Sequence, residues 1–153
     1  MARKACRICV ERNPGKIRSC AEFDSNAPVF LTNSILCLKE GPMDGAVRSR
    51  WVDVCADQHL RPLVRYLKPP VVVGMGSCGW RAVRRVFALD DAPERISQAA
   101  GSCWTAADGT RLFAVGHPGP QGLTNRPRPQ QLADWRRIGA AASRALVRGG
   151  HRF

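Results

Sequence analysis

Cysteine is the residue type whose number and spacing point most directly to chemistry in this chain. The 153-residue sequence contains seven cysteines. Cys6 and Cys9 are separated by two residues, the gap that lets one loop give two thiolates to one metal centre. Cys37 follows a predicted strand and Cys55 lies on the next predicted helix. Four such thiolates suit zinc or an iron–sulfur cluster.

The remaining cysteines leave alternatives open. Cys20 is able to replace any one of the four proposed ligands. Cys78 and Cys103 are more typical of buried small hydrophobic residues, since free cysteine is commonly buried. In a reducing cytoplasm a set of this size indicates metal binding rather than disulfides, and an odd number also fits a ligand set plus spare thiols.

Asn33 and His117 are polar residues at the ends of predicted strands. Asn33 interrupts the apolar run Val29–Cys37, and its amide carries both a donor and an acceptor, as reading the edge of a nucleobase requires. His117 lies between Gly116 and Pro118, directly after the last predicted strand. Near neutral pH it can donate a hydrogen bond to a leaving anion, and the plain alternative is an ordinary loop histidine.

The segment after His117 is predicted to be a loop rich in glycine and proline, residues 116–125. Within it Leu123 is followed by Thr124, Asn125 and Arg126. An apolar tip among small polar residues and arginine is typical of a wedge that enters a nucleic-acid stack.

The stretch Gly74–Gly79 matches the GxGxxG pattern between a strand and a helix. A dinucleotide site also needs an acidic residue at the end of a second strand about twenty residues later. Asp90 and Asp91 come too early, and no predicted strand leads to them. The pattern therefore favours a tight strand-to-helix turn, with a small nucleotide-binding domain as a competing hypothesis.

Strands and helices alternate along the chain, and their order decides where these side chains meet. The sequence predicts strands over 29–37, 71–75 and 111–115, helices over 48–67, 79–87 and 129–147, and a polar connection over 90–109. This order predicts an α/β fold, a three-layer αβα arrangement with a short central parallel sheet. Ligands bind beyond the carboxyl ends of such strands, which places Asn33, Gly76 and His117 on one rim.

Composition predicts one domain, an α/β unit over residues 29–153 preceded by an irregular segment over 1–28. The net charge of +12 attracts polyanions, of which nucleic acid is the commonest, although a genome that favours arginine and alanine codons gives the same surplus. No apolar run is long enough to span a membrane, and the basic N-terminus lacks the apolar stretch of a signal peptide. We therefore expect a cytoplasmic protein.

Four segments together resemble one family, the uracil-DNA glycosylase superfamily, and most closely its iron–sulfur branch of the family-four type. The resemblance covers about residues 29–140, in the right order. It is carried by Val29–Cys37 with its Asn33, by Cys55 with Leu60–Leu63, by Pro70–Gly76 and by Gly116–Pro120.

The resemblance implies an enzyme that flips uracil out of DNA, single or double stranded, and hydrolyses the N-glycosidic bond. It implies that Asn33 reads the uracil edge and that His117 stabilises negative charge on the departing base. The loop from Pro118 to Arg126 would occupy the gap in the DNA and hold phosphates. The residues assigned to this role are Pro118, Gly119, Leu123, Asn125 and Arg126.

The resemblance also implies a structural 4Fe-4S cluster, with zinc as the alternative. Its ligands would be Cys6, Cys9, Cys37 and Cys55, and the protein would act as a monomer away from membranes.

The sequence departs from the family in the short stretch between Cys9 and Cys37. The family places its first motif there: a Gly-rich loop after a strand, with a polar residue that positions water and an aromatic residue that stacks on uracil. In this chain only Phe23 and Asp24 are candidates for those roles. A catalytically degenerate DNA-binding module of the same fold is therefore the alternative hypothesis.

Overall fold

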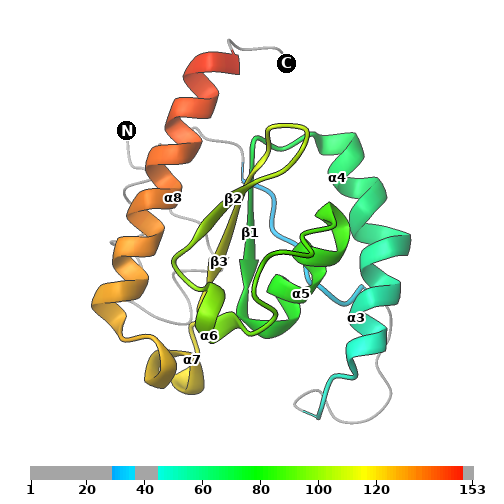
Figure 1. The fold of residues 1–153 in the computed structure, drawn as a ribbon, viewed down its shortest axis with the longest axis vertical. Helices are drawn as coiled ribbons and strands as arrows, with labels where there is room; N and C mark the ends of the chain where they lie inside the picture. The colour runs from blue at the N-terminus through cyan, green and yellow to red at the C-terminus, as the bar shows by residue number, and fades with distance from the viewer. Residues whose placement is uncertain (1–28, 37–44, 150–153) are drawn as a thin grey trace, which may run out of the picture.

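A mixed sheet lies between two layers of helices in the computed structural model, which describes residues 29–36 and 45–149 (Figure 1). Within these residues the sheet has the strand order β1-β3-β2, with β1 at Val71–Met75, β3 at Arg111–Val115 and β2 at Cys103–Thr105. β1 pairs parallel to β3, and β2 pairs antiparallel to β3. The α/β class and the three layers are as predicted, while the antiparallel β2 makes the sheet mixed.

Strands β1 and β3 begin and end at the predicted residues. Each is a short run of apolar residues bounded by turn-forming residues, and alternate side chains enter opposite layers of the molecule. Leu112 and Ala114 pack in the cluster around Trp80 on one face of the sheet. Phe113 and Val115 pack with Ile138 on the other face. The apolar residues of β3 are buried on both faces and the valines of β1 are partly buried on both, which explains why both strands are almost entirely apolar.

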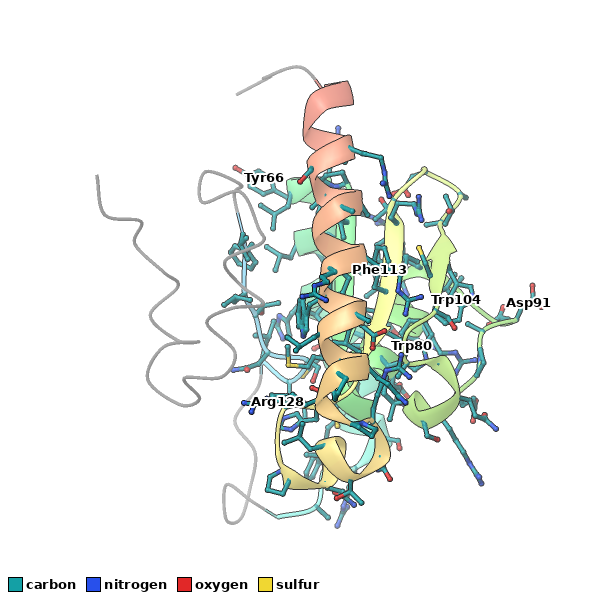
Figure 2. The ribbon with its side chains drawn as sticks, turned by 90° about the vertical axis from the view of Figure 1, so that its left-hand side faces the viewer. Tyr66, Trp80, Asp91, Trp104, Phe113 and Arg128 are labelled. Carbon is teal, nitrogen blue, oxygen red and sulfur yellow. The ribbon has the colours of Figure 1, made fainter. Side chains whose placement is uncertain are left out.

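The predicted strand over 29–37 is wrong for the part that the structure describes. Residues 29–36 have no regular secondary structure and lie on the β1 side of the sheet, away from β2 (Figures 1 and 2). Val29, Phe30 and Leu31 are 65%, 61% and 54% exposed. Their side chains suit a strand, but strand propensity needs a neighbouring surface that buries them, and no described residue forms such a surface over these three. Cys37 lies outside the described residues.

The predicted polar connection over 90–109 contains a helix and a strand. Helix α6 covers Ile96–Ala99, and β2 follows it. Trp80, on α5, holds this segment in place through two direct contacts. Its Nε1 donates a hydrogen bond to the carbonyl of Pro93 (2.7 Å), and the centroid of its ring lies 4.7 Å from that of Trp104. These contacts come from a helix distant in sequence, so local composition did not reveal them.

The layer opposite α8 contains one long helical segment and α5. The predicted helix over 48–67 is confirmed as α3 (Ser49–Cys55), a π-helical turn η2 (Ala56–Leu60) and α4 (Arg61–Leu67). It ends at Lys68 in the left-handed conformation, followed by two prolines that cannot continue a helix. Helix α5 covers Gly76–Phe87 and starts three residues earlier than predicted.

Helix α8 (Arg128–Gly149) covers the other face of the sheet and crosses in front of β3 in Figure 2. It matches the predicted helix over 129–147. Ile138 and Ala141 are its buried contacts with the sheet. Among the described residues, none of the helices has the length and apolar character needed to cross a bilayer.

Arginine–aspartate pairs join the α3–η2–α4 segment to α5. Arg81 donates to both carboxylate oxygens of Asp53, each at 2.7 Å. Asp57 accepts hydrogen bonds from Arg85 and Arg61, and these hold its pKa at about 2, below the ordinary value of 3.8. The guanidinium of Arg61 also donates to carbonyls at the end of α5, so the network fixes how the two helices pack.

We predict that Asp57→Asn lowers the Tm by a few degrees at pH 7 and that this difference shrinks steadily as the pH falls from about 4 through 2. The folded pKa of Asp57 is about 2 against an ordinary value of 3.8. Its ionised form therefore stabilises folding fully above the ordinary value, and this contribution is lost as the pH falls through the folded pKa of about 2. Thermal unfolding followed by circular dichroism across this range measures the effect. Asp91→Asn, at an exposed carboxylate that points into solvent in Figure 2, is the control, and an equal loss in both variants would contradict the prediction.

Candidate functional site at the carboxyl ends of β1 and β3

Parallel pairing brings the ends of β1 and β3 together. Met75 lies opposite Val115 in the register, so the next residues of both strands leave the sheet side by side. Gly76 adopts φ +68°, and a Cβ added there would lie 3.3 Å from the Cβ of His117. The two predicted rim residues Gly76 and His117 therefore contact each other, as the topology of a parallel pair requires.

The GxGxxG stretch forms the turn from β1 directly into α5. Gly76 is both the turning point and the first residue of the helix, and Met75 caps α5 without a side-chain hydrogen bond. The turn interpretation favoured by the sequence accounts for this geometry. The first-turn amides of α5 consequently lie at the end of the sheet where His117 is found, and such amides attract negative charge.

His117 is exposed, and its ring orientation is set by the loop that follows it. The backbone N–H of Gly119 donates a hydrogen bond to Nδ1 at 3.0 Å. A ring nitrogen that accepts a hydrogen bond carries no proton, so the neutral imidazole holds its proton on Nε2. The loop thus presents Nε2–H as a donor at the rim.

The predicted irregular loop after His117 contains a short helix, α7 (Pro120–Asn125). Figure 1 shows α7 at the end of the sheet towards which the β1 arrow points. A Cβ at Gly122 would lie only 1.8 Å from the carbonyl oxygen of His117. Helix α7 therefore packs directly on the backbone of His117, and only glycine fits at the contact.

The other residues predicted in this loop lie in different surroundings. Pro118, Gly119 and Leu123 are half-buried, and Asn125 is exposed. Arg126 forms a bidentate ion pair with Asp134, with 2.8 Å between Nη2 and Oδ1, and these hydrogen bonds raise its pKa. The guanidinium that was expected to meet phosphate is thus engaged inside the fold.

Asn33 is exposed on the segment beside β1. In the described part of the chain no hydrogen bond joins it to Gly76 or His117. Ile35, two residues later, packs against the cluster that includes Val52 and Ala82, between α3 and α5. The segment is therefore anchored after Asn33, while Asn33 itself is accessible to solvent.

One of the four proposed metal ligands falls within the described residues. Cys55 is completely buried and disulfide-bonded, whereas the thiols of Cys78 and Cys103 are free. Cys6, Cys9 and Cys37 lie outside the described residues. In 29–36 and 45–149, no three His, Cys, Asp or Glu side chains are grouped as a metal site. Cys55 fits a cluster or zinc only as a reduced thiolate.

Sequence reasoning missed three residues that organise the site: Gly122, Gln131 and Asp134. A signal for two of them was present. Gln131 and Asp134 fall on the same helical stripe as the buried Ile138 and Ala141, so they are polar residues at apolar positions of α8. A polar side chain on a buried stripe needs a partner, which is a reason to look for one.

Comparison with protein-family models found no match to the chain, and neither did comparison with curated proteins or with solved structures.

We predict that Gly122→Ala displaces α7 from His117 and breaks the hydrogen bond from the amide of Gly119 to Nδ1. The added methyl overpacks the contact, which costs about 1–3 kcal/mol of folding free energy. Long-range ¹H–¹⁵N NMR of the imidazoles should change from a single Nε2–H tautomer of His117 to a mixture. Gln121→Ala, at an exposed position of the same helix, is the control. An unchanged His117 spectrum in Gly122→Ala would contradict the assigned packing.

Proposed function

We propose that this protein acts on DNA as a uracil-DNA glycosylase-like repair protein, hydrolysing the N-glycosidic bond of a flipped uracil. The observation that carries the proposal is the held imidazole of His117. Its Nδ1 accepts from Gly119, its Nε2–H is available, and the first turn of α5 begins beside it at Gly76. A hydrogen-bond donor that is already oriented, beside the backbone amides of the first turn of a helix, suits a reaction in which negative charge develops on a leaving group.

The chemistry proposed for the rim is the loss of uracil as an anion. The bond between deoxyribose C1′ and uracil N1 breaks, and its electron pair passes to the base, where O2 shares the charge. The Nε2–H of His117 donates to that oxygen, and water adds to C1′ and releases one proton to the solvent. Because the imidazole is fixed before the base arrives, little reorganisation is needed when the charge forms.

Asn33 would recognise the flipped base in this proposal. Its amide offers a donor and an acceptor to the uracil edge, and its exposure leaves it accessible to a base presented from solvent. We assign no residue of the described part to positioning water. Asp24 and Phe23, the candidates for the first motif, lie outside the described residues.

The charge of the chain supports a nucleic-acid substrate. Lysine and arginine number 24 against 12 acidic residues, and several described aspartates are already paired with arginine. Exposed arginines remain on separate elements, such as Arg65 on α4 and Arg144 on α8. A surplus of this kind attracts the phosphate backbone independently of base sequence.

The second candidate is a catalytically degenerate module that binds DNA without cutting it. The observations that favour it are the missing first motif and the absence, among the described residues, of a hydrogen bond between Asn33 and the rim. Such a module would keep salt-sensitive DNA binding while forming no product.

A cluster or zinc would have a structural role in this protein. The proposed ligands are Cys6, Cys9, Cys37 and Cys55, with 4Fe-4S as the first choice and zinc as the second. When bound, the group would tie the N-terminal segment to the start of the helical layer through Cys55. No step of base excision passes through it.

We predict that the protein releases uracil from a single-stranded oligonucleotide, and that His117→Ala slows this release by about 10²–10³-fold. Alkali cleavage of the abasic strand under single-turnover conditions measures the rate. His59→Ala changes another exposed histidine, on η2, and should leave the rate unaltered.

The same assay separates the two candidate functions. Salt-sensitive binding of the oligonucleotide without any cleavage would identify the degenerate module. Absence of both cleavage and binding would reject both candidates.

We predict that protein purified without oxygen is brown and holds about four iron atoms per chain. Cys55→Ser should lose the colour and the iron, since a buried ligand position cannot be taken by the solvent-facing thiol of Cys103. Visible absorption and elemental analysis for iron and zinc are the measurements. Cys103→Ser is the matched control, and it should keep its metal. Protein free of both metals would end the proposal of a metal cofactor.

A further inference from the structure

Asp134 carries a charge that is almost completely buried. Its side chain is 2% exposed, Arg126 donates to both of its oxygens, and Arg137 donates to Oδ1 at 2.8 Å. A buried ion pair adds little stability compared with apolar residues of similar size, because removing the charges from water offsets their attraction. The effect of the pair is instead on geometry. Its two hydrogen bonds hold Arg126, at the end of α7, in one position against α8.

Gln131 lies one turn earlier on the same face of α8 and is 5% exposed. Its Nε2 donates to the carbonyl of Gly122 at 3.3 Å and to that of Arg126 at 3.1 Å. A Cβ at Gly116 would lie 3.2 Å from this same Nε2. One buried amide therefore contacts both the first residue of the loop and the end of α7.

The Arg126–Asp134 pair is also seated against the strand that leads to His117. A Cβ at Gly101 would lie 2.2 Å from Nη2 of Arg126 and 2.9 Å from Oδ1 of Asp134. The N–H of Gly101 donates to the carbonyl of Ala114 in β3, at 3.0 Å. His117 follows Ala114 by three residues, just after the end of β3. The ion pair and the histidine are therefore both positioned by β3.

From these contacts we infer that Arg126, Gln131 and Asp134, here called the loop clamp, are positioning residues for His117. The clamp acts through α7: Gly122 packs on the carbonyl of His117, and the amide of Gly119 holds its ring. None of the hydrogen bonds of the clamp reaches His117 itself. The inference rests on the proposed function and deepens it, because it says what keeps the hydrogen-bond donor in place before the base arrives.

The clamp matters because a donor aimed at a developing charge works only when it is already in place. A displacement of about 1 Å at the reacting centre can cost about 10²-fold in rate. A loop of glycines and prolines has no internal core to hold it, so its position must come from neighbouring elements. The clamp holds the loop in position from α8 and through its contact with Gly101, which is hydrogen-bonded to β3.

The test replaces the ion pair with apolar residues, in the double variant Arg126→Met with Asp134→Leu. We expect it to fold with a Tm close to that of the wild type, because no unpaired charge is left in the interior. We expect kcat for uracil release to fall by about 10²-fold with little change in KM. Long-range ¹H–¹⁵N NMR should show His117 losing its single tautomer. The matched control, Arg81→Met with Asp53→Leu, removes another bidentate pair and should leave kcat and the tautomer unaltered.

Gln131→Met is a second variant that keeps the ion pair and removes only the two hydrogen bonds to the carbonyls of Gly122 in α7 and of Arg126 at its end. We expect the same direction of change in kcat and in the His117 spectrum. Wild-type kcat and a single His117 tautomer in both variants would overturn the inference. If the wild type itself releases no uracil, the proposed reaction fails, and the imidazole spectra alone decide whether the clamp holds His117.

Discussion

Parallel pairing between β1 and β3 determines where the rest of the described structure lies. It fixes Met75 opposite Val115, so the turn into α5 and the loop that begins at Gly116 leave the sheet from neighbouring points. Because both strands are apolar on both faces, helices must cover each side, and α5 and α8 do so. The contact between Gly76 and His117 is a direct consequence of this single pairing.

Arginine serves two purposes in this chain. Some guanidinium groups form ion pairs that join one helix to another. Arg81 and Arg85 on α5 bind Asp53 and Asp57 of the preceding helices. Arg126, at the end of α7, binds Asp134 on α8. A planar guanidinium that binds a carboxylate through two hydrogen bonds is suited to that work. The remaining surplus gives the surface its positive potential, so a high arginine content does not by itself identify the residues that would meet a phosphate backbone.

The site rather than the fold carries the proposed function, because an α/β sheet of this kind hosts many chemistries. Its centre is an imidazole whose protonated nitrogen is chosen by a backbone amide, beside the start of a helix. The polar groups that hold the loop are buried on α8, and every buried side-chain polar atom in the described residues has a hydrogen-bond partner. This is the organisation expected of a site whose geometry is set before its ligand binds.

The sequence alone determined the features that depend on local pattern. Continuous apolar runs fixed β1 and β3, helical spacing fixed the segment from α3 to α4, and the position of His117 after β3 followed from both. Only the tertiary structure decided the rest. Segment 29–36 has strand-forming residues but no strand among the described residues, β2 depends on contacts with Trp80, and the polar Asp134 is acceptable at a buried position because Arg126 reaches it from another element. Propensity is a property of neighbours in sequence, whereas burial and ion pairing depend on neighbours in space.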